Sequence, residues 1–352
     1  MIYDGYRSRS ALRWEAATKL KGAVRLGLVG RHAPSELCFV EDSIHPMTLG
    51  VSSKSQVKSA VSASAPGKIN LTLDVRNQRP DGFHEIRSLV IGVDLRDRVR
   101  CIVHPKSQIT VACTDPNLNG QDNLVVTAAT KLAQGADHSG GVTIELDKRI
   151  PVASGLGGGS SDAAATLRLC NELWDANLSR EELATLGAQI GSDVPLFFSL
   201  PSALLSGRGE EVEAVTLRWS GWVLLVFANC QVSTREVYRA WRPSDGLGLP
   251  AGEEAGLMEA GSADELSALL RNQLAPAIFR VSPDVARAHQ ALKRLGFPSI
   301  RVSGAGSALY LLFDEQQAAM EAAQRVKRQG DGLTTMVVAA PAGESTILYE
   351  EL

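Results

Sequence analysis

The stretch Pro151-Val-Ala-Ser-Gly155-Leu-Gly157-Gly158-Gly159-Ser160-Ser161-Asp162 decides how the rest of this chain is interpreted. Residues 142–146 before it alternate apolar and polar side chains and are rich in β-branched types, which predicts a strand. Residues 163–174 after it place their large apolar side chains on one helical face, which predicts a helix. A glycine-rich segment therefore connects a strand to the start of a helix.

Such a segment is well suited to bind an anion. Glycine adopts backbone conformations that other residues resist, so that neighbouring N–H groups can converge. A helix start adds unpaired N–H groups and the positive end of the helix dipole, and phosphate is the usual ligand. The stretch contains no Lys, which excludes a P-loop, and Ser160 stands where the dinucleotide fingerprint needs its last Gly. A flexible Gly/Ser linker is the alternative, but linkers are not usually fixed between a strand and an apolar helix.

The composition is that of an ordinary globular protein. The 352 residues are enough for two domains, with 44% hydrophobic and 21% charged residues. The net charge of −3 gives no support to a nucleic-acid or anionic-membrane partner, and no apolar run is long enough to span a membrane. The cysteines are odd in number and lack metal-ligand spacing, which indicates reduced thiols in a cytoplasmic protein. They are Cys38, Cys101, Cys113, Cys170 and Cys230.

The first sixty residues differ from the rest of the chain. They hold nine Lys/Arg against five Asp/Glu, which gives them +4 while the remainder carries −7. We expect residues 1–63 to be an extension outside the fold, or the product of a misassigned start upstream of Met47. A basic, Ser-rich leader is also typical of a transit peptide, which would place the protein in a plastid, but the acidic residues are unusual for one.

Two short segments before the glycine-rich stretch carry polar side chains of interest. Residues 65–75 alternate like a strand, with Lys68 and Asn70 on one face, which suits either a pocket wall or a solvated surface. The Pro-Asp-Gly turn that follows delivers Phe83 and His84 together. An aromatic face beside an imidazole suits a flat heterocyclic base, although a packed Phe and a His without a binding role in a hairpin would give the same pattern.

Other elements follow from capping and turn signals. Asp122 is expected to cap a helix, and Ser179 opens a second helix with a capping box. That helix ends at a Gly- and Pro-containing corner where Asp193 is either a cap or a catalytic carboxylate. Residues 88–95 and 99–103 are expected to be separate strands, and residues 241–261 a loop. A late turn, Ser303-Gly304-Ala305-Gly306, lies between two predicted strands.

Taken in order, these motifs resemble those of the GHMP kinase superfamily. The segments that carry the resemblance are Ala65-Pro-Gly-Lys-Ile-Asn-Leu, Arg79-Pro-Asp-Gly-Phe-His, Asp122-Asn-Leu, Gly155-Leu-Gly-Gly-Gly-Ser-Ser-Asp-Ala-Ala, Gly191-Ser-Asp-Val-Pro-Leu-Phe and Val232-Ser-Thr-Arg-Glu-Val-Tyr. Within the superfamily they are similar to the kinases of 4-diphosphocytidyl-2-C-methyl-D-erythritol, over roughly residues 64–313. Each motif alone would be weak, and the combination is specific. The family commonly has Tyr at the position of Phe83.

The resemblance implies an α+β, two-domain GHMP kinase fold, with a ribosomal S5 domain 2-like N-terminal half and a ferredoxin-like C-terminal half. It places the ATP-binding domain at residues 64–215 and the C-terminal domain at residues 216–352. The implied reaction is phosphorylation of the 2-hydroxyl of 4-diphosphocytidyl-2-C-methyl-D-erythritol by ATP with Mg²⁺, a step in the non-mevalonate formation of isoprenoid precursors. The implied partner is this small molecule, with a monomeric or homodimeric enzyme in the cytoplasm and no nucleic acid or membrane partner.

The resemblance also assigns roles to residues. Lys68 and Asp193 correspond to the catalytic pair, and Asn70, Phe83 and His84 to the substrate-binding residues. Ser161 is a possible Mg²⁺ ligand. The residues corresponding to the ATP loop are Pro151, Val152, Ala153, Ser154, Gly155, Leu156, Gly157, Gly158, Gly159, Ser160 and Ser161.

Two alternatives stay open from the sequence. The chain could be another GHMP kinase, acting on homoserine, mevalonate or a sugar, but these substrates carry no nucleobase for Phe83 and His84 to hold. It could instead be a non-catalytic nucleotide-binding module, but such a module would need neither Lys68 nor Asp193.

Overall fold

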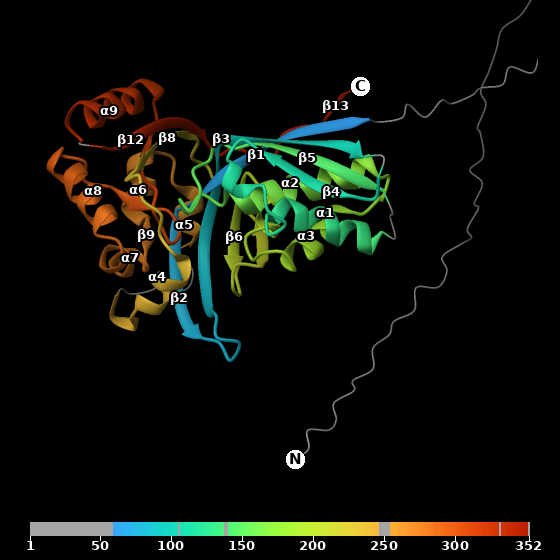
Figure 1. Ribbon diagram of the computed structural model, residues 1–352. Helices are drawn as coiled ribbons and strands as arrows, with labels where there is room; N and C mark the ends of the chain where they lie inside the picture. The colour runs from blue at the N-terminus through green and yellow to red at the C-terminus, as the bar shows by residue number, and fades with distance from the viewer. Residues whose placement is uncertain (1–58, 105, 137–139, 246–253, 331, 351–352) are drawn as a thin grey trace, which may run out of the picture. The chain divides into compact units, whose positions relative to one another are not determined.

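The computed structural model describes residues 59–104, 106–136, 140–245, 254–330 and 332–350. These residues belong to one unit, Gln56–Leu352. Most of the expected N-terminal extension, including Met47 and Cys38, lies outside the described residues. The ordered elements of this unit are shown in Figure 1.

A large sheet is built around one long strand. Strand β3 has 21 residues and pairs antiparallel with β1, β2, β5 and β6. The parallel pairs are β4 with β5 and β2 with β9, and the short β13 pairs with β1 at one edge. The strands of this sheet are β1 (Ala60–Asn70), β2 (Thr72–Gln78), β3 (His84–His104), β4 (Ile109–Cys113), β5 (Gly141–Asp147), β6 (Ser202–Ser206), β7 (Glu211–Ala214), β9 (Arg271–Asn272) and β13 (Leu348–Glu350).

Helices α1 (Leu124–Gly135) and α2 (Gly158–Leu173) pack against this sheet, and α3 (Arg180–Ala188) packs against these two helices. Helix α2 lies on β1 and β3 and also contacts α1 and α3. Its Ala-rich first half and the apolar residues that follow are buried, which closes a core between the helices and the sheet. The 3-10 turns η1 (Pro116–Leu118) and η2 (Pro195–Phe198) precede α1 and follow α3.

The second sheet has the order β10-β11-β8-β12 and is antiparallel. It consists of β8 (Gly221–Phe227), β10 (Arg301–Val302), β11 (Leu309–Phe313) and β12 (Thr334–Ala340). The accompanying helices are α4 (Thr234–Ala240), α5 (Glu254–Glu259), α6 (Ala263–Leu269), α7 (Ala275–Val281), α8 (Pro283–Arg294) and α9 (Gln316–Gln329), with the 3-10 turn η3 (Pro243–Asp245). A core that includes Ile69, Trp219 and Tyr310 joins this sheet to the strands of the first.

Several local predictions are confirmed and several need correction. The predicted capping box at Ser179 and the strand at 142–146 are both present. The helix expected at 163–174 begins earlier, at Gly158, because the glycines and serines form its first turn. The two strands expected at 88–95 and 99–103 are one strand, β3, which continues past a register shift opposite Pro66/Gly67.

Two further predictions are wrong in detail. The cap of α1 is Asn123, whose side chain accepts a hydrogen bond from Val125 N, and not Asp122. The segment expected to be a loop at 241–261 contains η3 and α5 among its described residues. Strand β1 begins at Ala60, before the predicted domain start, and the domain boundaries themselves stay a prediction. Among the described residues, we find no helix with the length and apolar character needed to cross a membrane.

Candidate active site

The glycine-rich stretch meets two distant segments of the chain, those around Lys68 and around Ser303. Three successive carbonyls of the glycine loop are held by groups from distant segments. The carbonyl of Ser154 accepts from Ala308 N at 2.9 Å, and that of Leu156 accepts from Lys68 N at 2.8 Å. The Gly155 carbonyl between them accepts from Ser303 Oγ at 3.0 Å. The loop is therefore held by the segment around Lys68 on one side of it in the sequence and by the segment around Ser303 on the other.

Glycine is required at two positions of this loop. Gly155 and Gly157 have φ values of 78° and 71°, in the left-handed region that favours glycine. A Cβ atom on Gly155 would also collide with the Ser303 carbonyl oxygen and lie 2.8 Å from that of Gly306. Gly157 is the residue that caps α2, so the loop leads directly into the helix.

The first turn of α2 faces a cavity. Gly158, Gly159 and Ser160 are the first residues of the helix, and their N–H groups have no acceptor within it. All three residues line a cavity of about 1810 Å³. These amides and the positive end of the helix dipole lie where the sequence predicts an anion site, and the ligand itself stays a prediction.

Lys68 and Asp193 come together at the same cavity. Lys68 Nζ lies 3.5 Å from Asp193 Oδ2, and the two side chains are 7% and 37% exposed. Lys68 Nζ also donates to Asn70 Oδ1 at 2.7 Å, and Asn70 Nδ2 donates to Ser88 Oγ at 2.8 Å. Asn70 thus holds the ammonium group of Lys68 in place, while the carboxylate of Asp193 keeps access to the cavity.

The local fold explains why Asp193 is presented in this way. It stands in the turn between α3 and η2, where Val194 N donates to Gly191 O at 3.1 Å. The next four residues, 194–197, are buried in the core. Because its apolar neighbours anchor the turn, the polar side chain of Asp193 remains at the surface of the cavity.

An aromatic group lines another part of the cavity. The His84 ring stacks on Tyr238 with centroids 5.4 Å apart and meets the edge of Trp241 at 5.4 Å. Phe83 is 51% exposed, and the guanidinium of Arg208 lies over its ring at 5.0 Å. Burial lowers the pKa of His84, which favours the neutral imidazole with one donor and one acceptor nitrogen at pH 7. All five of these residues line the cavity.

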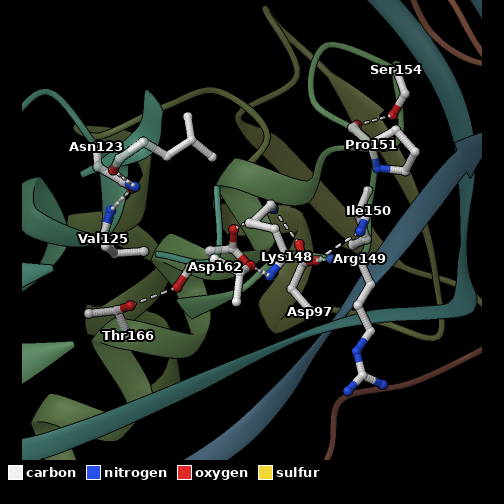
Figure 2. Close-up of polar contacts among 12 residues, drawn as sticks. Asp97, Asn123, Val125, Lys148, Arg149, Ile150, Pro151, Ser154, Asp162 and Thr166 are labelled. Carbon is white, nitrogen blue, oxygen red and sulfur yellow. Dashed lines mark hydrogen bonds and ion pairs between the residues drawn. The ribbon is translucent and has the colours of Figure 1, made fainter. Parts of the chain in front are cut away.

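A charged cluster lies at the start of the glycine loop (Figure 2). Lys148 contacts the carboxylates of Asp97 and Asp162. Burial raises the pKa of the Asp162 carboxyl to about 7, with Lys148 opposing the rise and Asp97 adding to it. Burial works against the charge of Lys148, but the two carboxylates together hold its pKa above the ordinary value.

Comparison with known proteins identifies the family. The model described as GHMP kinases N terminal domain matches residues 123–199, and that described as GHMP kinases C terminal matches residues 255–332. The chain is 38% identical over 273 residues to the 4-diphosphocytidyl-2-C-methyl-D-erythritol kinase of Shouchella clausii strain KSM-K16, which covers 77% of this chain and 90% of the relative. It is 40% identical over 250 residues to the same kinase of Bacillus subtilis strain 168, with 70% and 86% covered.

The chain belongs to the 4-diphosphocytidyl-2-C-methyl-D-erythritol kinase family. A crystal structure of a 4-(cytidine 5'-diphospho)-2C-methyl-D-erythritol kinase matches it with a TM-score of 0.66 at 32% identity, covering 80% of this chain and all of that one. The homoserine kinase of Cytophaga hutchinsonii also reaches a TM-score of 0.66, at 17% identity, over 83% of this chain and 98% of that one. That second likeness shows the fold alone. The family is decided by sequence, and the two-domain GHMP kinase fold is confirmed by both.

In this chain, not every residue of the predicted ATP loop lines the cavity. Most residues from Pro151 to Ser160 line it, but Leu156 and Ser161 are not among the lining residues. Leu156 is buried in the core, which agrees with its apolar side chain. The Ser161 hydroxyl is buried and has no hydrogen-bond partner among the described residues. The assignment of these residues to nucleotide or metal binding stays a prediction.

Sequence reasoning missed several cavity residues of this kinase. Tyr238 lies in one of the segments that carried the family resemblance, yet its role was not foreseen, because nothing in the sequence pairs it with His84. Arg208 was given no role, although it lines the cavity beside Phe83. The Asp97 and Lys148 pair, 51 residues apart in sequence, left no recognisable pattern.

Proposed function

We propose that this protein transfers the γ-phosphate of ATP to the 2-hydroxyl of 4-diphosphocytidyl-2-C-methyl-D-erythritol. The family membership supports the reaction, and one geometric observation carries the assignment to this chain. The Lys68–Asp193 pair, the amides of the glycine loop and the aromatic group around His84 all line one cavity. A cavity of about 1810 Å³ offers room for a phosphate donor and an acceptor together.

The phosphate donor is assigned to the glycine loop. Main-chain N–H groups at the start of α2 bind phosphate oxygens, and the helix dipole favours their charge. Phosphoryl transfer depends chiefly on alignment and on stabilisation of charge. Because the loop carbonyls are tied to Lys68, Ser303 and Ala308, the amides are positioned before the nucleotide arrives.

A magnesium ion fits this arrangement as a companion of the nucleotide. No group of three or more His, Cys, Asp or Glu suited to holding a metal occurs among the described residues. Mg²⁺ in kinases is usually held by phosphates and one or two protein oxygens. Ser161, whose buried hydroxyl has no hydrogen-bond partner among the described residues, is the residue of this chain that would help to hold such an ion. When bound, the ion neutralises charge on the β- and γ-phosphates.

Lys68 and Asp193 are assigned different roles in the transfer of the phosphoryl group. The Asp193 carboxylate accepts the proton of the attacking hydroxyl as the new phosphate bond forms. The Lys68 ammonium offsets negative charge on the transferred phosphoryl group. Asn70 keeps the ammonium directed toward the cavity through its own hydrogen bond.

The aromatic residues are assigned to the acceptor. Cytosine has a flat face for Phe83 and a hydrogen-bonding edge for the neutral His84 imidazole. Tyr238 extends the same wall, since its ring stacks on His84. This aromatic group is the observation that disfavours homoserine, mevalonate or a sugar as the acceptor, because none of these carries a base. The Lys68–Asp193 contact disfavours a module that only binds nucleotides.

A direct assay separates these possibilities. Purified protein is incubated with ATP and Mg²⁺ and each of three acceptors: the cytidyl substrate, mevalonate and homoserine. ADP release is measured for each. We expect release with the cytidyl substrate alone. Release with mevalonate or homoserine in preference would refute the assigned acceptor, and ATP binding without release with any acceptor would favour a binding module.

Phe83→Ala tests the base-binding role. We expect KM for the cytidyl substrate to rise about 5- to 150-fold, since stacking of a base on an aromatic ring contributes about 1–3 kcal/mol. KM for ATP is expected to stay within twofold of the original, because the glycine loop is untouched. Phe83→Tyr is the matched control, which retains the ring and is expected to retain the affinity. An equal loss for both substrates would argue against stacking at position 83.

Location and assembly belong to the same proposal. The relatives are bacterial, and the cysteines within the described residues, Cys101, Cys113, Cys170 and Cys230, are free thiols. Both facts support a reducing cytoplasm. The assembly is proposed to be a monomer or a homodimer, which gel filtration with light scattering would measure.

A further inference from the structure

Three charged side chains are buried together at a distance in sequence from the catalytic pair (Figure 2). Lys148 Nζ donates to Asp162 Oδ2 at 2.7 Å and also to Asp97 Oδ2. The side chains of Lys148, Asp97 and Asp162 are only 9%, 0% and 3% exposed. The proposed reaction uses none of these three groups directly.

The cluster joins three separate parts of the fold. Asp97 lies on β3, Lys148 follows the end of β5, and Asp162 lies in α2. Asp97 Oδ1 also accepts from the main-chain N–H groups of Arg149, at 2.5 Å, and Ile150, at 2.8 Å. One carboxylate therefore holds both the side chain of Lys148 and the backbone that leads into the glycine loop.

The same cluster touches the far end of the loop. A Cβ atom on Gly158, the first residue of α2, would lie 3.1 Å from Lys148 Nζ and 3.0 Å from Ile150 Cγ2. The start of the loop and its helical end are thus packed on each other around the Lys148 ammonium. Asp162, four positions further along α2, completes the connection from the helix side.

Stability alone does not account for this arrangement. Burying charged groups carries a desolvation penalty, and well-packed apolar residues of similar volume often stabilise a fold as well or better. A charged cluster does provide directional contacts at defined distances, which apolar packing does not. Here the contacts determine how far the start of the loop stands from the first turn of α2.

We propose that Asp97, Lys148 and Asp162 are positioning residues that set the shape of the glycine loop for the triphosphate. They act through the backbone at Arg149, Ile150 and Gly158, and need not touch the nucleotide. The inference deepens the proposed function, because it assumes that this loop binds the phosphate donor.

Asp97→Asn is the first test, measured on the full chain. Asn offers one oxygen where Asp97 offers two, so either the loop amides or Lys148 must lose an acceptor. We expect the Kd for ATP, measured by titration calorimetry, and KM for ATP to rise about tenfold or more, because small displacements of binding groups have large effects. KM for the cytidyl substrate is expected to change less than twofold. Removing a negative charge near the triphosphate would by itself tighten binding, so weaker binding reports on geometry.

Asp314→Asn is the matched control. Asp314 Oδ1 alone accepts from Trp219 Nε1 at 2.9 Å and from Ala263 N at 2.8 Å, so one amide oxygen can keep both contacts. It is expected to leave both KM values unchanged. A folded Asp97→Asn protein with unaltered or tighter ATP binding would overturn the proposal, as would an equal loss for both substrates, which indicates a purely structural role.

Asp97→Glu keeps the test decisive if the first variant does not fold. It preserves the charge and both oxygens but adds one methylene, which shifts the start of the loop. We expect weaker ATP binding in this variant too, and unchanged ATP binding would overturn the proposal. Calorimetry with ATP needs no acceptor. Wild-type protein that binds ATP but does not phosphorylate the cytidyl substrate would therefore refute the proposed function and leave this test valid.

Discussion

Asp193→Asn is expected to lower kcat by about 10²- to 10⁴-fold, the usual contribution of a positioned general base. Asn has nearly the same shape and cannot accept the hydroxyl proton. Its amide still fits beside Lys68, whose Nζ lies 3.5 Å from Asp193 Oδ2 and retains its hydrogen bond to Asn70. The Kd for ATP should change little, because the loop amides and α2 are unaffected. Steady-state kinetics combined with calorimetry measure both quantities.

Asp284→Asn provides the control for Asp193→Asn. Asp284 pairs with Arg287 at the exposed start of α8, with side chains 53% and 71% exposed, and neither residue lines the cavity. The same chemical change there should leave kcat unaltered. Turnover of Asp193→Asn near that of the original protein would refute the role of this carboxylate and, with it, the catalytic part of the proposed function.

Gly155→Ala is expected to have the second largest effect. Ala at φ 78° is strained by about 1–3 kcal/mol. Its methyl group would also meet two carbonyl oxygens, those of Ser303 and Gly306, which belong to backbone and cannot rotate away. The turn at residues 303–306 must then move away from the loop, which breaks the hydrogen bonds that hold successive carbonyls of the loop. We expect ATP affinity to fall by about 100-fold and the Tm to fall by roughly 10 °C.

Gly332→Ala separates the clash from backbone strain. Gly332 has a similar φ of 71°, but an added Cβ would meet nothing within 4 Å. It should lose only about 1–2 kcal/mol of stability and keep its affinity for ATP. Thermal unfolding and nucleotide titration of the two variants provide the comparison. If Gly155→Ala binds ATP as well as Gly332→Ala does, the loop tolerates a side chain and its shape is not what binds the phosphates.

Local signals in the sequence predicted much of the fold. The capping box at Ser179 was predictable because it depends on two residues that are only three positions apart. The start of α2 was misplaced because glycine and serine are poor indicators of helix, and only the packed sheet beneath makes them helical. The long β3 was divided in two because its register shift is a property of the pairing with β1, which the strand's own residues do not display.

The same distinction between local signals and long-range contacts applies to the candidate site. Lys68, Asp193 and the glycine loop were predicted because each lies in a short motif that resembles those of the family, and the structure brings them to one cavity. The stacking of His84 on Tyr238 and the burial of Asp97 against Lys148 were not found, because these partners are distant in the chain and ordinary in type.

The sequence by itself determined the family, and it predicted the phosphate-binding character of the loop and the catalytic roles of Lys68 and Asp193. The prediction for the loop depends on local backbone freedom, which neighbouring residues are enough to reveal, and the two catalytic roles depend on the resemblance of short motifs to those of the family. Only the tertiary structure decided that Ser303 Oγ and Lys68 N hold the loop carbonyls and that Lys148 lies buried between two carboxylates. Contacts of this kind arise when strands and helices far apart in the chain pack together. The resulting burial strengthens the electrostatic interactions of each charged group.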